Sequence, residues 1–378
     1  MALTKKDGCR VKVGGVNYYL SGTLLEIDNR SPHENGFMFR PRVSLVEDVA
    51  GVADPNVSSK TFSYKAVYEY YDGTGQITRS APSEAFTKTT GASTEFIRVT
   101  YYGHPASLKF NNNTLTAPTI VLYRTKNNGT TYYRLIERED SLILGPTFTY
   151  NDILADAAIE DNEILYTTGD VIENDPAPPA EFMTTGGGRI YLGGLENRDE
   201  FAYSKTQLAG ESVAFSDFFR IRVPSAAGSD KSSPSAVGYM DGKLILFRQG
   251  SISYVDGDGP NETGSNDTFT SPEVISTDVG SDEPRSVVNI PGGVMFKSKK
   301  GIYLLDRGLG VNYIGAAVED YNNDVISSSI LLTDASEVRF YLDTGTVLVY
   351  NYVFDQWSTD TSQADTDADI WGSSPVIV

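Results

Sequence analysis

The sequence predicts a nearly all-β protein in which β-propeller blades accompany a fibronectin-III-like or immunoglobulin-like β-sandwich. Short apolar runs bounded by Gly, Asn, Asp and Pro recur along most of the chain, as expected for many short strands. No stretch of 12 or more residues has a convincing helical spacing of apolar side chains, and the best helical candidate, residues 153–164, is weak. A faint repeat in the second half carries strands rather than helices.

The pattern divides the chain into three regions. Residues 1–58 hold a few strands, expected to form part of a propeller blade, and long polar loops. Residues 59–165 predict a fibronectin-like sandwich of about seven strands. Within it, FSYKAVYEYYDGTGQITRSAPSE is two strands around a loop rich in Asp and Gly, and IVLYRTKNNGTTYYRLIE is a hairpin with Asn-Asn-Gly at its turn. Residues 166–185, which contain Asp-Pro-Ala-Pro-Pro, predict a linker.

Residues 166–378 are expected to form propeller blades, in a set that need not be complete within these residues. The repeat has four copies: GGGRIYLGGLENRDEFAYSK, DGKLILFRQGSISYVDGDG, PGGVMFKSKKGIYLLDRG and ASEVRFYLDTGTVLVYNYVFDQW. Their markers Gly188, Gly242, Gly293 and Glu337 are spaced by 54, 51 and 44 residues, a period typical of blades. The alternative is a meandering sandwich with coincidental spacing.

Both ends of the chain bear on whether the ring closes. The opening segment KVGGVNYYLSG resembles the second half of a blade, and the final DIWGSSPVIV ends on a run that predicts a strand. Either further blades lie outside this chain, or residues 1–58 complete the ring.

The formal net charge of −19 argues against specific binding to nucleic acid or an anionic membrane. Such binding needs clustered Lys and Arg, and the longest basic cluster is one short run at residues 297–300. A negative surface repels DNA, which suits a tube through which DNA slides.

Cysteine content and hydropathy give three further expectations. Cys9 is the only cysteine, so no intrachain disulfide is possible. No run of 18 apolar residues predicts a membrane span. The opening MALTKKDGCRVKV has no apolar core of a secretory signal.

Candidate catalytic residues are few, and no enzymatic activity is expected. His33 and His104 lie outside any metal-ligand spacing, no GxSxG elbow is present, and both are expected to be loop or surface histidines. Gly186, Gly187 and Gly188 superficially suggest a phosphate cradle, but the strand-like RIYLGG follows them, so a tight turn is expected.

Asp256 and Asp258 are the one candidate metal site, with Ca²⁺ as the possible ion. They open a loop that also holds Asn261, Glu262, Asn266 and Asp267, and oxygen ligands at alternate positions with intervening glycines can wrap Ca²⁺. The full EF-hand spacing is not met, since Pro260 replaces the third ligand. A second acidic group is expected to be a solvated loop; its members are Asp360, Asp365, Asp367 and Asp369.

A glycosidase on a propeller scaffold is the third functional alternative. It needs two facing carboxylates, but 50 acidic residues always allow a pair to be nominated. Sugar sites in such folds often use exposed tryptophans, and only Trp357 and Trp371 occur, each next to a strand.

Several segments together resemble the podovirus tail nozzle family, also called tail tubular protein B or head-to-tail stabilisation proteins. They are, in chain order, SGTLLEIDNRSPHENGFMFRPRV, FSYKAVYEYYDGTGQITRSAPSE, IVLYRTKNNGTTYYRLI, PPAEF, GGRIYLGGLENRDEFAYSK, KSKKGIYLLDRGLGVNYIGAAVEDYN and VFDQWSTD. No single one is as specific as a metal-ligand motif, and their order is the main support. Relatives are commonly longer than this chain.

The resemblance implies a virion protein of the phage tail without catalytic residues. It implies a ring, six copies in relatives, below the portal and adaptor proteins, which forms part of the DNA-ejection channel and holds tail fibres or spikes. In such a ring we expect acidic side chains on the lumen and exterior, and Tyr and Phe at subunit contacts. The alternative is a β-propeller binding module for a cell-surface glycan or protein.

Overall fold

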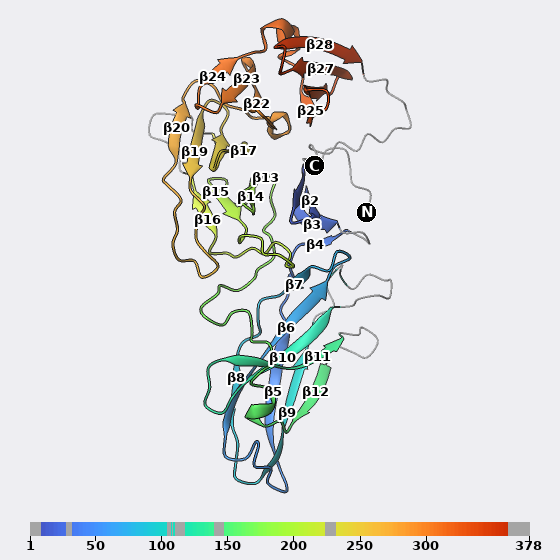
Figure 1. Ribbon diagram of the computed structural model, residues 1–378, viewed down its shortest axis with the longest axis vertical. Coiled ribbons are helices and arrows are strands. Elements are labelled where there is room, and N and C mark those ends of the chain that lie inside the picture. The colour runs from blue at the N-terminus through green and yellow to red at the C-terminus, as the bar shows by residue number, and fades with distance from the viewer. Residues whose placement is uncertain are drawn as a thin grey trace.

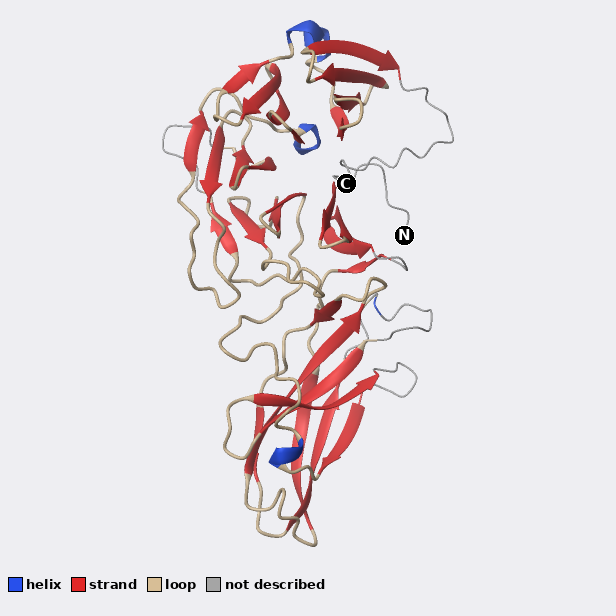
Figure 2. Cartoon of the chain, in the orientation of Figure 1, coloured by secondary structure: helices blue, strands red, loops and turns tan. Residues whose placement is uncertain are grey.

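The computed structural model describes residues 9–27, 32–103, 107, 109, 118–139, 147–223 and 232–361. Nearly all of the regular structure in these residues is β (Figures 1 and 2). The helices described are short 3₁₀ segments: η2 (Asp156–Ala158), η3 (Pro284–Ser286) and η4 (Ala316–Tyr321). None of them is long and apolar enough to cross a membrane. The molecule is elongated, with an arc of small sheets above and a sandwich below in the view of Figure 1.

Five four-stranded antiparallel sheets, each made of four consecutive strands, form the arc, which we call the body. The first sheet contains β1 (Cys9–Val13), β2 (Val16–Ser21), β3 (Thr23–Ile27) and β4 (Pro32–Glu34). The second contains β13 (Phe182–Gly186), β14 (Arg189–Gly193), β15 (Glu200–Tyr203) and β16 (Arg220–Arg222). The third contains β17 (Ala236–Met240), β18 (Lys243–Phe247), β19 (Ile252–Asp256) and β20 (Glu273–Ser276). The fourth contains β21 (Val288–Ile290), β22 (Gly293–Ser298), β23 (Gly301–Asp306) and β24 (Val311–Tyr313). The fifth contains β25 (Ile326–Leu332), β26 (Glu337–Leu342), β27 (Thr346–Asn351) and β28 (Gln356–Thr361).

Successive sheets of the body pack face to face through separate apolar layers. The first strand of each sheet contacts the first strand of the next, from β1 through β13, β17 and β21 to β25. Strands alternate their side chains between two faces, so each inner sheet contributes one face to each neighbour. In the fourth sheet, for example, Phe296 packs toward the third sheet and Met295 toward the fifth. This arrangement is compatible with the blades of a β-propeller.

The arc is open within the described residues. Hydrophobic clusters join the first sheet to the second, the second to the third, the third to the fourth and the fourth to the fifth. No such cluster among the described residues joins the fifth sheet back to the first. A closed ring is therefore not visible in this part of the chain, and the expected C-terminal strand lies outside it.

The glycine markers of the repeat lie at or beside the turn between the first two strands of a sheet. Gly187 and Gly188 have φ of 58° and 73° between β13 and β14, and Gly242 has φ of 80° between β17 and β18. Tight hairpin turns of this kind require positive φ, which glycine adopts without a steric penalty. The expected turn at residues 186–188 is thus present, and a strand follows it rather than a helix.

The second part of the molecule is a sandwich inserted between the first and second sheets. One sheet has the order β11-β10-β6-β7, with β8 also paired to β6, and the other has the order β12-β9-β5. The strands are β5 (Arg42–Ala50), β6 (Thr61–Tyr71), β7 (Ile77–Arg79), β8 (Phe86–Thr89), β9 (Thr94–Tyr102), β10 (Thr119–Thr125), β11 (Tyr132–Glu139) and β12 (Thr147–Asp152). Both expected hairpins are present, in β6–β7 and β10–β11.

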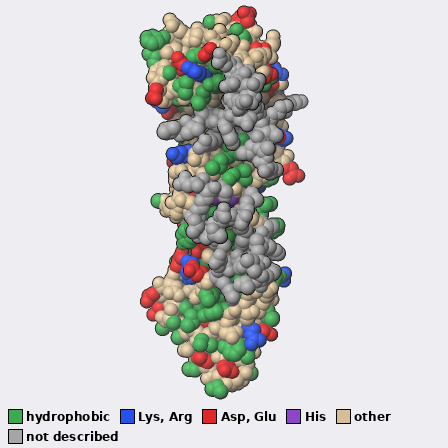
Figure 3. All heavy atoms as spheres, turned by 90° about the vertical axis from the view of Figure 1, so that its right-hand side faces the viewer, with side chains coloured by type: hydrophobic (Ala, Val, Ile, Leu, Met, Phe, Trp, Pro, Cys, Tyr) green, Lys and Arg blue, Asp and Glu red, His purple; other side chains and the backbone are tan. Residues whose placement is uncertain are grey.

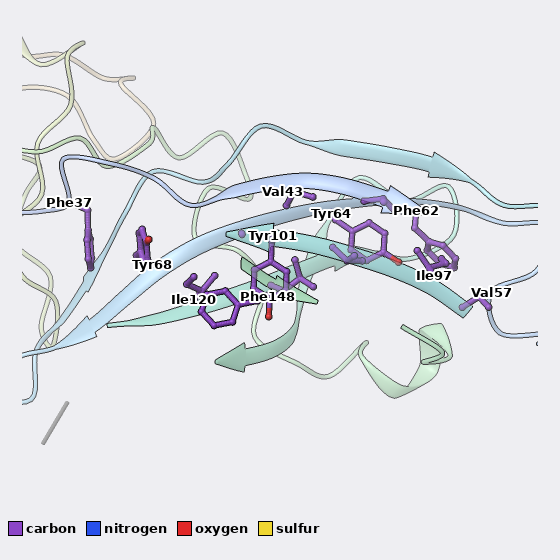
Figure 4. Close-up of a cluster of buried hydrophobic side chains, with 14 of the residues drawn as sticks. Phe37, Val43, Val57, Phe62, Tyr64, Tyr68, Ile97, Tyr101, Ile120 and Phe148 are labelled. Carbon is purple, nitrogen blue, oxygen red and sulfur yellow. The ribbon is translucent and has the colours of Figure 1, made fainter. Parts of the chain in front are cut away.

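Both sheets contribute to one core in the sandwich (Figure 4). Phe62 and Tyr64 of β6 and Ile120 of β10 face Ile97 of β9 and Phe148 of β12, and all are buried. The alternation of large buried residues along β6, interrupted by half-buried Ser63 and Lys65 on the outer face, explains why this segment forms a strand with one face in the core.

Three expectations from the sequence differ from the structure. The boundary at residue 58 is too late, because β5 belongs to the sandwich; a bulge between Val43 and Leu45 breaks the alternation that would have identified the strand. KVGGVNYYLSG is the first half of a sheet rather than the second, because Gly14-Gly15 joins β1 to β2. Residues 153–164 hold only the short η2.

Candidate binding site

A cleft of about 260 Å³ lies on the outer face of the five-stranded sheet, toward the end of the sandwich that points away from the body. Its floor is the start of β6, and its walls are β8 and the β10–β11 hairpin. The ring of Phe62 is buried in the core, so this residue reaches the cleft only through its backbone. The lining is otherwise small and polar apart from one aromatic, Tyr132, and the full set is Thr61, Phe62, Ser63, Thr87, Thr125, Asn128, Gly129, Thr130 and Tyr132. Ligands bind most often in concave clefts, where placed polar groups fix their orientation.

The hydroxyl groups of the cleft form a connected set. Tyr132 Oη is 2.9 Å from Ser63 Oγ, and Thr87 Oγ1 donates to the same Ser63 Oγ at 3.1 Å. Thr125 Oγ1 accepts the Ser63 backbone N–H at 3.0 Å. Serine and threonine hydroxyls both donate and accept hydrogen bonds, so this set can be completed by a ligand in either role.

The hairpin that walls the cleft is fixed by its own backbone and by β6. Asn128 has φ of 55°, a conformation that Asn tolerates better than most residues. Its N–H donates to Thr61 O at 2.9 Å, and the Thr61 N–H donates to Asn127 Oδ1 at 2.9 Å. The Asn127 N–H in turn donates to Asp156 Oδ2 at 2.9 Å. The turn is therefore held at several points before any ligand arrives.

A buried ion pair supports this hairpin from inside the sandwich. Arg124 Nη1 lies 2.7 Å from Asp152 Oδ2, both side chains are fully buried, and Arg124 Nη2 reaches Asp156 Oδ1 at 3.2 Å. Tyr64 Oη donates to Asp152 Oδ2 at 2.8 Å. Burial, followed by the nearby Asp152 carboxylate, raises the pKa of Tyr64 well above its usual value of 10.0. Asp156 thus links the charged core to the turn of the cleft.

A second ionic network fixes the sandwich to the body. Glu69 is fully buried between the guanidinium groups of Arg79, at 3.3 Å, and Arg134, at 3.2 Å. Arg79 also pairs with Glu211 of the body at 2.8 Å and with Glu163 at 2.7 Å. The backbone makes the same connection, since Ile77 N–H donates to Gly210 O and Ser212 N–H donates to Ile77 O. The orientation of the cleft relative to the body is therefore constrained.

His33 is not a surface histidine, which corrects the expectation from the sequence. It lies on β4 and is 1% exposed, with Nε2 3.1 Å from Oε2 of the buried Glu26. Its ring meets that of Tyr70 edge-on at 5.2 Å. Glu26 and His33 lie on the same face of the first sheet. The sequence did not show this, because β4 is short and polar and has no alternating pattern of apolar residues. His33 therefore helps to join the first sheet to the sandwich.

The structure places the predicted calcium ligands Asp256 and Asp258 at the end of β19 and in the loop after it. Asp256 Oδ2 is 3.1 Å from Lys243 Nζ, and the Asp258 carbonyl accepts a hydrogen bond from Arg189 Nε at 3.1 Å. Asn261 Oδ1 accepts hydrogen bonds within its own loop. The described part of the chain contains no group of three or more His, Cys, Asp or Glu arranged to hold a metal. Calcium binding stays a prediction.

The remaining candidates are only partly within the described chain. Trp357 lies on β28, half-buried, and its indole N–H donates to Ile314 O at 2.8 Å. Asp360 is exposed on the same strand. His104, Asp365, Asp367, Asp369 and Trp371 lie outside the described residues.

Comparison with known proteins gives no family. No protein-family model and no curated protein sequence matches the chain. Among solved structures, the crystal structure of Saccharomyces cerevisiae Sqt1 is similar over 93% of this chain and 85% of that chain, at 8% identity and a TM-score of 0.32. A likeness at this level supports no statement about fold or function.

Proposed function

We propose that the protein is a non-catalytic binding module that contacts a glycan or a protein at a cell surface. The observation that carries the proposal is the position of the hydroxyl-lined cleft, at the free end of a sandwich whose other end is anchored to the body. Binding residues occur most often on loops held by a rigid scaffold. The body is the scaffold, and the free end of the sandwich is the contact surface.

The sheet orders support a finer assignment of the folds. The order β11-β10-β6-β7 resembles that of strands G, F, C and C′ of an immunoglobulin-like or fibronectin-like sandwich, and β5 and β9 precede β6 and β10 in the chain as B and E precede C and F. Strand β12, which pairs with β9 and follows β11, has no counterpart in that order. Loops 51–60 and 126–131 are then the B–C and F–G loops, which form the binding end of immunoglobulin variable domains. The body is proposed to be a β-propeller of which five blades are described.

Retention of the chain on bacterial envelope preparations tests this function. Thr130→Arg places a bulky charged side chain at the exposed rim of the cleft and is expected to lower retention at least about tenfold, because it blocks access. Thr149→Arg is the matched control, since Thr149 is also exposed but lies on β12 of the opposite sheet. Equal retention of both variants and the parent chain would contradict a role for the cleft end.

A second candidate, a ring subunit of a phage tail nozzle, is favoured by exposed apolar side chains on the body. Phe218, Phe354 and Val353 are 80%, 71% and 62% exposed. Large exposed apolar groups are suited to burial at subunit contacts. Partners in that setting are adaptor and portal-side proteins and tail fibres, and the acidic surface suits passage of DNA.

Light scattering on the purified chain tests this second candidate. A ring of about six copies supports a nozzle subunit. Phe354→Ser is expected to shift such a ring toward monomers, whereas a mass independent of this substitution argues against the apolar contact.

A further inference from the structure

We propose that the cleft of the sandwich binds a neutral sugar, through the hydroxyl set centred on Ser63. This inference rests on the proposed binding function and names the ligand class at the same site. The feature that distinguishes the cleft is its chemistry: of the described residues that line it, none is charged, and most offer a hydroxyl or an amide. Sugar hydroxyls need partners that both donate and accept, which serine, threonine and tyrosine hydroxyls provide.

The charge distribution selects among glycans. The chain carries a net charge of −19, which disfavours approach of sialylated, sulfated or phosphorylated sugars. Two cations beside the cleft are already engaged, because Lys65 Nζ lies 5.1 Å from the centre of the Tyr132 ring and Lys126 pairs with Glu160 at 2.9 Å. No carboxylate lines the cleft within the described residues, so a cationic ligand has no counter-charge there. A neutral sugar avoids both penalties.

The walls of the cleft are preorganised for such a ligand. The turn that carries Asn128 is tied to Thr61 and, through Asn127, to Asp156 and the buried Arg124. Weak polar ligands gain affinity when the site does not have to be ordered on binding. Residues such as Tyr, Ser, Gly and Asn are also those that immunoglobulin binding loops favour for adaptable polar contact.

Three side chains have distinct expected roles. Ser63 Oγ is the shared centre, since Tyr132 Oη and Thr87 Oγ1 both hydrogen-bond to it. Thr87 is exposed and Tyr132 is half-buried, so both hydroxyls can turn to a ligand. Thr130, at the exposed rim, limits entry.

The test uses the full chain, an immobilised panel of neutral oligosaccharides and the sialylated counterpart of each. We expect binding to at least one neutral member, little change between low and high salt, and no gain from sialic acid, since no ion pair forms. Thr87→Val and Tyr132→Phe each remove one hydroxyl while keeping the shape, and each is expected to weaken binding up to about tenfold.

The matched control is Thr149→Val, the same change at an exposed position of the opposite sheet. It is expected to bind like the parent chain, and equal melting temperatures of all variants verify that the fold is intact. Neutral binding that is unaffected by Thr87→Val and Tyr132→Phe would overturn the assignment of the cleft.

The ligand class and the binding function fail in different ways. If Thr130→Arg abolishes envelope binding but no neutral oligosaccharide binds, the module recognises another ligand, such as a protein, and the sugar inference is wrong. If Thr130→Arg leaves envelope binding unchanged, the proposed function itself fails.

Discussion

The sandwich and the body solve the problem of burying β-sheets in different ways. In the sandwich, two sheets share one core that also encloses the Arg124–Asp152 pair. In the body, each sheet packs only on its neighbours, through layers that form separate clusters. The comparison teaches that the sandwich should unfold as one unit, whereas the body, like other repeat architectures, should lose its end sheets locally.

The largest expected effect is in the sandwich. Asp152→Ala leaves the fully buried Arg124 guanidinium without its 2.7 Å partner, and loss of one member of a buried pair costs about 3–5 kcal/mol of unfolding free energy. Chemical denaturation followed by near-ultraviolet circular dichroism measures this loss. Lys126→Ala, which breaks an exposed pair next to the same hairpin, is the control and should change little. Similar losses for both substitutions would contradict a charged core.

The next largest effect separates the body from the sandwich. Phe340→Ala removes a fully buried ring that stacks on Trp357 at 6.2 Å in the last described sheet, and such truncations cost about 3 kcal/mol or more. Because the fourth and fifth sheets share their own cluster, we expect faster amide hydrogen exchange in these two sheets only, with a change in tryptophan fluorescence. Uniformly faster exchange through the sandwich would show that the two regions are one cooperative unit.

Alkaline pH provides a third comparison. Burial, followed by the Asp267 carboxylate, raises the pKa of Tyr203 in the body to about 12, and Tyr64 in the sandwich is raised well above 10. The folded state keeps these phenols neutral while the unfolded chain ionises them near pH 10, so their stabilisation is present below pH 10 and is lost as the pH rises. The loss is about 1.4 kcal/mol per pH unit for each such tyrosine.

Absorbance at 295 nm checks this prediction. Tyr203 should titrate near pH 12 in the folded chain, whereas Tyr64 should ionise only when the sandwich unfolds. A Tyr64→Phe variant should lose less unfolding free energy above pH 10 than the parent chain. An unchanged dependence of stability on pH would contradict the role given to Tyr64.

The smallest effect concerns one turn at the free end of the sandwich. Asp48 accepts hydrogen bonds from the Thr94 hydroxyl and from the Gly91 N–H at 2.7 Å, and these bonds, the Thr94 hydroxyl first, lower the pKa of Asp48 below 3.8. When folding lowers a carboxyl pKa, the stabilisation is complete at pH values above the pKa of the unfolded chain. It is lost as the pH falls through the pKa of the folded chain. Because Asp48 is only half-buried, solvent screens its interactions and Asp48→Asn should cost no more than about 1 kcal/mol. Acid titration of both proteins measures it, and an identical acid loss would contradict the assignment.

Local patterns identified most strands but not the assembled sites. The Asn-Asn-Gly turn and the turns at glycine pairs could be predicted from the sequence, because a positive φ restricts which residues can occupy a position. The position of β5 in the sandwich could not be predicted, because the bulge after Val43 breaks the alternation of apolar and polar residues. The cleft was not predicted either, since Ser63, Thr87 and Tyr132 come from three strands and are ordinary outward-facing residues until the sheet order is known. A row of Thr and Ser on the polar face of predicted strands was the only available signal.

The insertion of the sandwich between the first and second sheets has a mechanical consequence. Both chain connections, residues 35–41 and 153–181, cross the same junction, and the first and second sheets share one apolar layer. A force applied to the free end of the sandwich is therefore divided between these two connecting segments. They lead into adjacent sheets that pack on each other. The force is borne at the junction, by the Arg79–Glu211 ion pair and the backbone bridge between Ile77 and Glu211. The third, fourth and fifth sheets of the body lie beyond this junction and bear little of the force.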